Sequence, residues 1–211
     1  MNQNMTEMVI GGTRAFWVTK RAFDLLFSVA LLPLLFAGGT TIFVLNLIFN
    51  RGTLILRQTR VGLNGETFVM YKFRTMYSPR YIGRASDREQ QRTPPLGRFL
   101  KRYWLDEAPQ LVNVIAGHMS LIGPRPEQPS FAAEFSKSLS GYDQRHRIRP
   151  GLTGLAQVEG GYIVDRAGSY RKLALDLRYV RRAGFQMDGV VLWRTFMMFL
   201  PNPSRGHRKK V

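Results

Sequence analysis

The longest uncharged stretch of the chain limits its fold more than any other feature. Residues 25 to 45, LLFSVALLPLLFAGGTTIFVL, hold 21 positions without a charged side chain. As a helix rising ~1.5 Å per residue, this segment would reach roughly 31 Å, about the hydrocarbon thickness of a bilayer. No small-residue cleavage pattern follows it, so we expect the segment to stay in the mature chain. The sequence therefore predicts a membrane-associated protein.

Basic residues flank the apolar segment on both sides. They are Arg14, Lys20 and Arg21 before it, and Arg51, Arg57 and Arg60 after it. Lys and Arg accumulate on the cytoplasmic side of membrane helices. Because both flanks favour that one side, a re-entrant helix is favoured over a kinked full span or a buried core helix.

Pro33 predicts a bend inside the segment. It has no amide hydrogen, and its ring clashes with the carbonyl of Val29. Gly38 and Gly39 weaken the helix further on and offer a second place to bend. A carbonyl freed by the bend needs a donor within the membrane. The candidate donors are Ser28, Thr40 and Thr41, or ordered water.

The remainder of the chain predicts a mixed α/β domain. Its hydrophobic content of 45% is enough to form a core. Two strands between residues 54 and 76 are joined through Asn64-Gly65, a dipeptide typical of hairpin turns. This alternation would place Lys72 and Arg74 on one face of the second strand. Residues 78 to 95 predict a surface loop that could cover a site.

Helices are expected after this loop. Their predicted ranges are 96 to 105, 106 to 117, 131 to 139 and 169 to 182. Residues 185 to 200 are strongly apolar and predict either a core helix or one that lies in a membrane interface.

The charge balance points to anionic partners. The chain has 31 Lys and Arg against 14 Asp and Glu, a formal net charge of +17. Phosphates, nucleic acid and anionic lipid all fit this charge. The absence of cysteine excludes disulfides and thiolate metal sites, and the three histidines are scattered. Any bound metal is therefore expected to have oxygen ligands.

Two adjacent carboxylates, Asp106 and Glu107, lie in the basic context YWLDEAPQ. At a helix start, an ionised carboxylate is stabilised and can act as a nucleophile on phosphorus. Lys101 and Arg102 would approach Asp106 if the helix continued through this joint. The alternative is structural, because an aspartate at a helix start is often a cap.

Arginines downstream predict a phosphate site. Arg125 lies between two prolines that stiffen its loop. Arg145, Arg147 and Arg149 precede a glycine-rich turn and could surround a phosphate. A solvated basic face is the alternative for such a run.

Taken together, KRAFDLL, YKFRTM, LDEAPQLVNVIAGHMSLIGPRP and RPGLTGLAQV resemble the bacterial sugar transferase family, the monotopic phosphoglycosyl transferases. The resemblance runs from Lys20 to Leu200. It implies a compact, helix-rich α/β (α+β) membrane-associated catalytic domain with an N-terminal re-entrant helix. The implied segments are an N-terminal tail (1–19), the re-entrant helix (20–50), a cytosolic transferase domain (51–200) and a basic tail (201–211).

The resemblance also implies an activity. The family transfers a sugar 1-phosphate from a UDP-sugar to undecaprenyl phosphate and releases UMP, at the cytoplasmic face of the bacterial inner membrane. It starts exopolysaccharide, O-antigen or glycoconjugate synthesis. The implied partners are UDP-sugar, undecaprenyl phosphate and anionic lipid of the inner leaflet, without nucleic acid, and a homodimer is left open.

By position, Asp106 matches the family nucleophile and Glu107 its Mg²⁺-binding partner. The implied substrate-binding residues are Lys72, Arg74, Lys101, Arg102, Arg125, Arg145, Arg147 and Arg149. The chain departs from the family where a Ser-Pro pair usually breaks the helix: it has Phe36-Ala37 there, with Pro33 one turn earlier.

Two other functions compete with sugar-phosphate transfer as explanations of the sequence. A non-catalytic basic protein of membrane surfaces or nucleic acid would explain the charge but not the carboxylate pair. A metal-dependent glycosyltransferase of nucleotide-sugar-binding fold would need an Asp-x-Asp motif, which the chain lacks.

Overall fold

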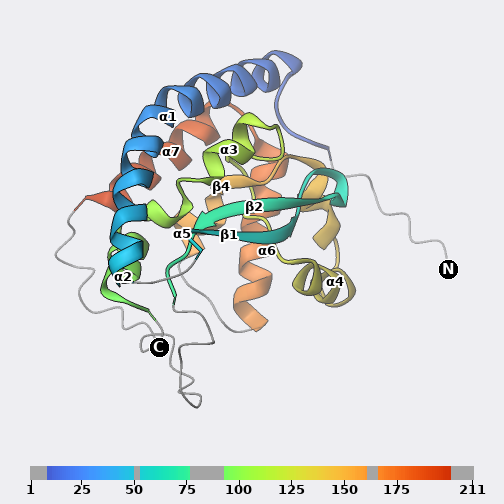
Figure 1. Ribbon diagram of the computed structural model, residues 1–211. Helices are drawn as coiled ribbons and strands as arrows, with labels where there is room; N and C mark the ends of the chain where they lie inside the picture. The colour runs from blue at the N-terminus through green and yellow to red at the C-terminus, as the bar shows by residue number, and fades with distance from the viewer. Residues whose placement is uncertain (1–8, 50–52, 77–92, 161–165, 201–211) are drawn as a thin grey trace.

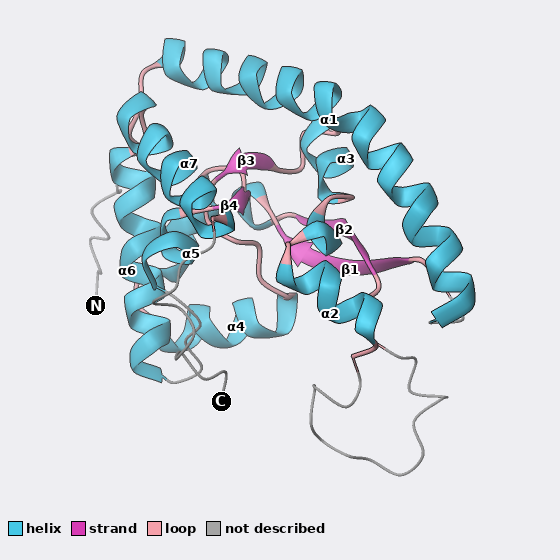
Figure 2. Cartoon of the chain, turned by 90° about the vertical axis from the view of Figure 1, so that its left-hand side faces the viewer, coloured by secondary structure: helices cyan, strands magenta, loops and turns pink. Residues whose placement is uncertain are grey.

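A computed structural model of the chain describes residues 9–49, 53–76, 93–160 and 166–200. A long helix, α1 (Arg14–Phe49), lies over a helix-rich domain that contains two small sheets (Figures 1 and 2). The expected helix-rich α/β class is thus confirmed. Residues 1–8 of the predicted N-terminal tail (1–19), the predicted basic tail (201–211) and most of the predicted loop at 78–95 lie outside the described residues.

Helix α1 is one continuous helix of 36 residues, with Pro33 inside it. It begins at Arg14, six residues before the predicted start of the membrane segment at residue 20. Both views show that the helix changes direction part-way along (Figures 1 and 2). Thr40 and Thr41 donate to the carbonyls of Phe36 and Ala37, at 2.9 and 3.1 Å, and such bonds favour helix bending.

The first half of α1 has its polar side chains turned inward. Lys20, Asp24 and Ser28 recur every four residues and are 8%, 2% and 0% exposed. Leu26 and Leu34, on the outer face, are 73% and 69% exposed. A soluble surface helix has the opposite arrangement. By length and composition α1 could cross a membrane, and only 6% of its most apolar window is buried.

The inward residues fasten α1 to the domain. Lys20 Nζ donates to Asp188 Oδ2 at 2.8 Å, and Asp24 Oδ1 accepts from the amide of Leu121 at 3.1 Å. Arg21 donates to the carbonyls of Val114 and Ile115, at 2.7 and 3.2 Å. These are the last two carbonyls of helix α3 (Gln110–Ile115), at the end where a helix leaves carbonyls without an i+4 amide partner.

The predicted hairpin is confirmed. Strands β1 (Ile55–Val61) and β2 (Thr67–Phe73) pair antiparallel, with Ile55 opposite Phe73 and Val61 opposite Thr67. A single turn, η1 (Leu63–Gly65), joins them. Asn64 and Gly65 have φ angles of 53° and 83°, the left-handed region that Asn and Gly tolerate best.

The predicted helices before and after Trp104 are both present, but the second starts later than expected. Helix α2 (Pro95–Arg102) is capped by Tyr103. A single 3₁₀ turn, η3 (Leu105–Glu107), then precedes α3. Trp104, between them, has a left-handed φ of 58°. A left-handed residue breaks the helical direction, so the carboxylates are not one helical turn from Lys101 and Arg102.

The GPRP and RPGLTG motifs meet in the second sheet. Strands β3 (Ser120–Ile122) and β4 (Gly151–Thr153) pair in parallel. Gly123 donates to Thr153 O and Gly151 donates to Pro124 O, both at 2.9 Å. A Cβ on Gly151 would overlap the backbone of Gly123, so the two motifs approach as closely as glycines allow.

The C-terminal half is largely helical, and the helices predicted near 131–139, 169–182 and 185–200 are present. Helices α4 (Pro129–Ser138), α5 (Leu155–Gly160), α6 (Arg166–Arg182) and α7 (Phe185–Phe199) follow, with a 3₁₀ segment, η4 (Tyr142–Arg147). Helix α5 is a short helix that was not predicted. The main core joins β2, α3, β3, α6 and α7. On α7, Val191 is buried, whereas Phe185 and Trp193 are 62% and 63% exposed. Helix α7 is thus a surface helix with an apolar outer face.

Thr75 and Gly97 are in contact, although they lie on opposite sides of residues 77 to 92 in the sequence. A Cβ on Gly97 would overlap the carbonyl of Thr75, so the start of α2 packs directly on the chain that follows β2. Thr75 and Gly97 are both buried.

The buried Lys20–Asp188 pair yields a stability prediction. Lys20→Met leaves the Asp188 carboxylate, 13% exposed, without its cation and with the hydroxyl of Tyr179, at 2.6 Å, as a remaining donor. It should lower the free energy of unfolding by about 3 to 5 kcal/mol. The double variant Lys20→Met/Asp188→Asn should recover part of this loss. Arg14→Met, at an exposed position, is the control and should change stability by about 0.5 kcal/mol or less. Thermal unfolding in detergent measures all three, and additive losses would contradict the coupling.

His146 predicts a pH dependence of stability. Burial, and then the charge of Arg145, lower the pKa of His146 from 6.5 to about 4. Between these values the unfolded chain takes up a proton that the folded chain does not, so stability should fall as pH falls through this window. His146→Phe keeps a ring against Tyr142 and should flatten the dependence. Unchanged pH slopes in denaturant unfolding would rule out this assignment.

Candidate active site

Asp106 and Glu107 lie on the η3 turn, between the end of α2 and the start of α3. Both are partly buried. Ala108 and Pro109 continue with right-handed helical angles, so η3 leads into α3 without a change of hand. The carboxylates therefore project from a short, well-defined turn ahead of a buried helix.

Glu107 is held by Arg125 from the GPRP motif. Arg125 Nη1 donates to Glu107 Oε2 at 2.9 Å, and Nη2 donates to Oε1. The side chain of Glu107 is only 14% exposed. A bidentate Arg–carboxylate pair fixes geometry as well as charge. The structure thus joins two residues that sequence reasoning had assigned to one site from separate motifs.

Lys72 and Asp106 influence each other electrostatically across β2 and η3. Burial raises the pKa of Asp106 and Glu107 raises it further, whereas Lys72, a hydrogen bond from its own amide and Arg125 oppose the rise. Burial lowers the pKa of Lys72, and the charge of Asp106 opposes that shift. Lys72 is thus a cation beside the proposed nucleophile.

Arg60 belongs to the same cluster and was missed as a site residue. The sequence offered it only as a basic flank of the membrane segment. The structure places it on β1, where it donates to Pro126 O at 3.2 Å and to Gln58 Oε1 at 2.8 Å. Burial lowers the pKa of Arg60, and the nearby charge of Arg125 lowers it further. Gln58 and Arg60 lie two residues apart on a predicted strand and therefore share one of its faces. This spacing was the sequence signal that could have identified Arg60 as more than a membrane flank.

Arg145 supports the site from within the protein. It is 2% exposed and donates to Asp176 Oδ2 from Nε and Nη2, at 3.0 and 2.7 Å. It also donates to Tyr142 Oη at 2.9 Å and to the backbone carbonyl of Arg125 at 2.7 Å. These partners are protein groups, so this geometry makes Arg145 a support for the Arg125 loop.

Other predicted substrate residues lie elsewhere. Arg147 and Arg149 line a cavity of about 240 Å³ beside Lys20 and Arg21 of α1. Arg149 Nε donates to Gly117 O at 2.8 Å, at the end of α3 opposite the carboxylates.

Residues of α2 and the strand that follows β2 complete the predicted set. Arg102 is exposed and lies over the ring of Tyr103, 5.9 Å from its centre. Lys101, also on α2, and Arg74, directly after β2, are partly buried. Arg74 donates its amide hydrogen to Leu54 O at 2.9 Å and so extends the hairpin. Their roles toward substrate remain predictions.

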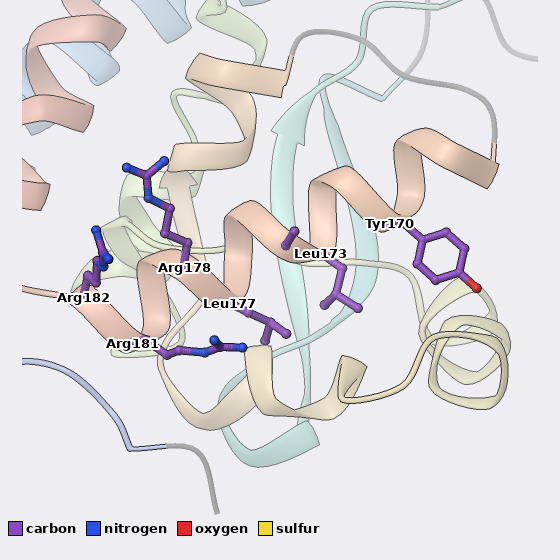
Figure 3. A pocket seen from close by; sticks show the side chains of 7 residues that line it. Tyr170, Leu173, Leu177, Arg178, Arg181 and Arg182 are labelled. Carbon is purple, nitrogen blue, oxygen red and sulfur yellow. The ribbon is translucent and has the colours of Figure 1, made fainter.

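Another cavity has no carboxylate of the pair in its lining. A shallow groove of about 570 Å³ is lined entirely by α6 (Figure 3). Apolar side chains, Leu173 and Leu177, line its middle, and Arg178, Arg181 and Arg182 gather at one end (Figure 3). None of the predicted site residues lines it.

Exposed apolar side chains lie on the segment that leads into the carboxylate turn. We call Phe99, Tyr103 and Leu105, which are 40% to 52% exposed, the apolar rim. The ring of Trp104 meets Phe199 of α7 edge-on, with centroids 6.4 Å apart. On the other side, a Cβ on Gly39 of α1 would lie 3.6 Å from Phe73 at the end of β2. The site therefore opens among surfaces that favour an apolar environment.

A metal ion would have few protein ligands here. Within the described residues, no cluster of three or more His, Cys, Asp or Glu is found. Glu107 offers two oxygens that Arg125 holds in place and that keep further lone pairs. Such a set fits Mg²⁺, which is commonly bound through one or two carboxylates together with substrate phosphates.

Known proteins are similar to this chain over most of its length. A relative in Komagataeibacter xylinus, an undecaprenyl-phosphate glucose phosphotransferase, is 38% identical over 83% of this chain and 35% of its own. A UDP-N-acetylgalactosamine-undecaprenyl-phosphate N-acetylgalactosaminephosphotransferase of Aeromonas hydrophila is 33% identical, over 86% and 43%. The chain thus spans less than half the length of these two relatives.

A relative of similar length is also found. The exopolysaccharide production protein PSS of Rhizobium leguminosarum bv. phaseoli is 35% identical over 84% of this chain and 93% of its own. The family model described as bacterial sugar transferase matches residues 15–202. That match covers α1, the carboxylate pair and both sheets, so the chain belongs to the bacterial sugar transferase family.

Proposed function

We propose that this protein transfers a sugar 1-phosphate from a UDP-sugar to undecaprenyl phosphate at the cytoplasmic face of a bacterial inner membrane. The observation that carries the proposal is the cluster of Asp106, Glu107, Lys72 and Arg125 beside the apolar rim. Charged groups suited to phosphate lie next to surfaces suited to lipid. The names of the similar proteins support the substrate classes.

The reaction proceeds in two displacements at one phosphorus. A carboxylate oxygen of Asp106 attacks the phosphorus attached to the sugar, and the bond from that phosphorus to the bridging oxygen breaks, so that UMP leaves. A phosphate oxygen of undecaprenyl phosphate then attacks the same phosphorus and displaces the Asp106 carboxylate. No net oxidation occurs, and the enzyme returns to its starting form.

The cations have distinct parts in these steps. Lys72, next to Asp106, offsets negative charge on the equatorial phosphate oxygens during both displacements. Arg125 holds Glu107, and the buried Arg145–Asp176 pair holds Arg125 through its backbone carbonyl. Glu107 would hold Mg²⁺, which when bound supplies further positive charge to the phosphates.

The attachment of both ends of α1 supports the proposed membrane arrangement. Before the helix, the Gly11 amide donates to Val180 O of α6 at 2.9 Å; after it, Leu54 O accepts from Arg74. Both attachments are to the same domain, which supports a helix that enters and leaves by one face. The exposed aromatic side chains of α7 would rest in the same interface.

The central prediction is kinetic. Because Asp106 would hold the phosphosugar between two displacements, labelled UMP should exchange into UDP-sugar without lipid acceptor, and the rates should follow ping-pong kinetics. The intact mass of the enzyme should rise by one phosphosugar. Asp106→Asn removes the nucleophile but keeps a side chain able to cap a turn, and should abolish exchange and mass shift.

Glu107→Gln is the matched variant for the metal role. It should abolish turnover as well. Both variants should still insert in membranes, but only Asp106→Asn should unfold near the wild-type temperature, because Glu107→Gln removes the carboxylate that pairs with Arg125. Near-normal activity of Asp106→Asn would return that residue to a capping role. Exchange that requires lipid, with intersecting double-reciprocal plots, would indicate direct transfer without an enzyme-bound intermediate.

Topology can be tested with single cysteines, because the chain has none. Val9, before α1, and Thr53, after it, are exposed, and Lys137 on α4 marks the catalytic domain. For a re-entrant helix, Val9→Cys, Thr53→Cys and Lys137→Cys should all react with an impermeant maleimide only from the cytoplasmic side. Periplasmic labelling of position 9 alone would show that α1 spans the bilayer.

A further inference from the structure

Gln110 is a buried amide without hydrogen-bond partners. It is 1% exposed, and neither its nitrogen nor its oxygen has a partner in the part of the chain that the structure describes. Buried polar groups are normally paired, because an unpaired one costs free energy. A residue that lowers stability in this way calls for a reason to be present.

Asn113, on the same helix, shows what a purely structural amide looks like. It is also 1% exposed, and its Nδ2 donates to Val69 O at 2.7 Å while its Oδ1 accepts from the Tyr71 amide at 3.1 Å. Both groups of Asn113 thus fasten α3 to β2, whereas both groups of Gln110, three residues earlier, do not.

In the sequence, Gln110 lies between Asp106 and Asn113, and both of these residues are related to β2. Asn113 fixes one end of α3 over residues 69 to 71 of β2, and Asp106 lies within reach of the charge of Lys72, further along the same strand. Helix α3 and β2 lie side by side in both views (Figures 1 and 2). Since residues three apart share a helix face, Gln110 lies on the same face of α3 as Asn113, at the end of the helix that follows Asp106.

We infer that Gln110 is a positioning residue whose carboxamide bridges Lys72 and Asp106 when the active site is occupied. The inference rests on the proposed function of Asp106. The Nε2 group would donate to the Asp106 oxygen that does not attack, and Oε1 would accept from Lys72 Nζ. A neutral amide is suited to this place, because it has a donor for the anion and an acceptor for the cation.

This bridge would act on orientation. With one oxygen of Asp106 engaged, the other points at the phosphorus, and Lys72 stays beside the equatorial oxygens. Misplacement of a reacting group by about 1 Å can cost about 100-fold in rate. If the Asp106 carboxylate rotated freely, its attacking oxygen would be misplaced and the rate would fall in this way.

The test compares Gln110→Leu with Asn113→Leu in the full-length protein. Leucine has a similar volume and no polar atoms, so Gln110→Leu removes two unpaired groups, and its unfolding temperature in detergent should equal or exceed that of the wild type. Its kcat should fall about 10- to 100-fold with KM for UDP-sugar unchanged. UMP release without acceptor should slow by the same factor. Asn113→Leu should instead lower the unfolding temperature, because it leaves two backbone groups of β2 unpaired.

Gln110→Glu separates the two hydrogen bonds. Glutamate keeps the acceptor for Lys72 but has no donor for Asp106, so its kcat should fall as far as that of Gln110→Leu. A drop in unfolding temperature of Gln110→Leu as large as that of Asn113→Leu would overturn the inference, because the amide would then be structural. Wild-type kcat in Gln110→Leu, with Asp106→Asn inactive, would also overturn it while leaving the proposed function intact. Activity in Asp106→Asn would refute the proposed function itself.

Discussion

The fold depends on how a largely apolar helix is fastened to a charged domain. A buried polar stripe does this: Lys20 pairs with Asp188, Asp24 accepts from Leu121, and Arg21 completes the carbonyl end of α3. Because these contacts occupy the inner face of α1, its apolar side chains remain outside, an arrangement that suits contact with lipid. The same contacts connect α1 with α3, whose opposite end leads to Asp106 and Glu107.

The charged cluster is stable because each buried ion has partners. Asp176 neutralises Arg145, which in turn holds the Arg125 loop, and Arg125 neutralises Glu107. Lone buried charges would be costly, whereas paired ones keep their geometry. Gln110 carries no charge, and its unpaired amide lowers stability, which is consistent with the positioning role that we infer for it.

The sequence predicted the elements of this fold better than their contacts. Periodicity and turn residues located the hairpin and the helices, and motif order placed Asp106, Glu107 and Arg125 in one site. Lys20, Arg21 and Arg60 were treated as membrane flanks because charge near an apolar segment usually has that meaning. Their burial depends on partners more than 60 residues away in the sequence, such as Asp188 and Pro126. The left-handed turn at Trp104 was also missed, because bulky residues rarely adopt it.

The contact between Thr75 and Gly97 has an evolutionary consequence. The backbones of these two residues pack directly against each other, although 21 positions separate them in the sequence. A stretch whose two ends are joined in this way can gain, lose or exchange residues at little cost to the rest of the fold. Such changes would leave β2 and α2 in place, and with them the turn after α2 that carries the carboxylates.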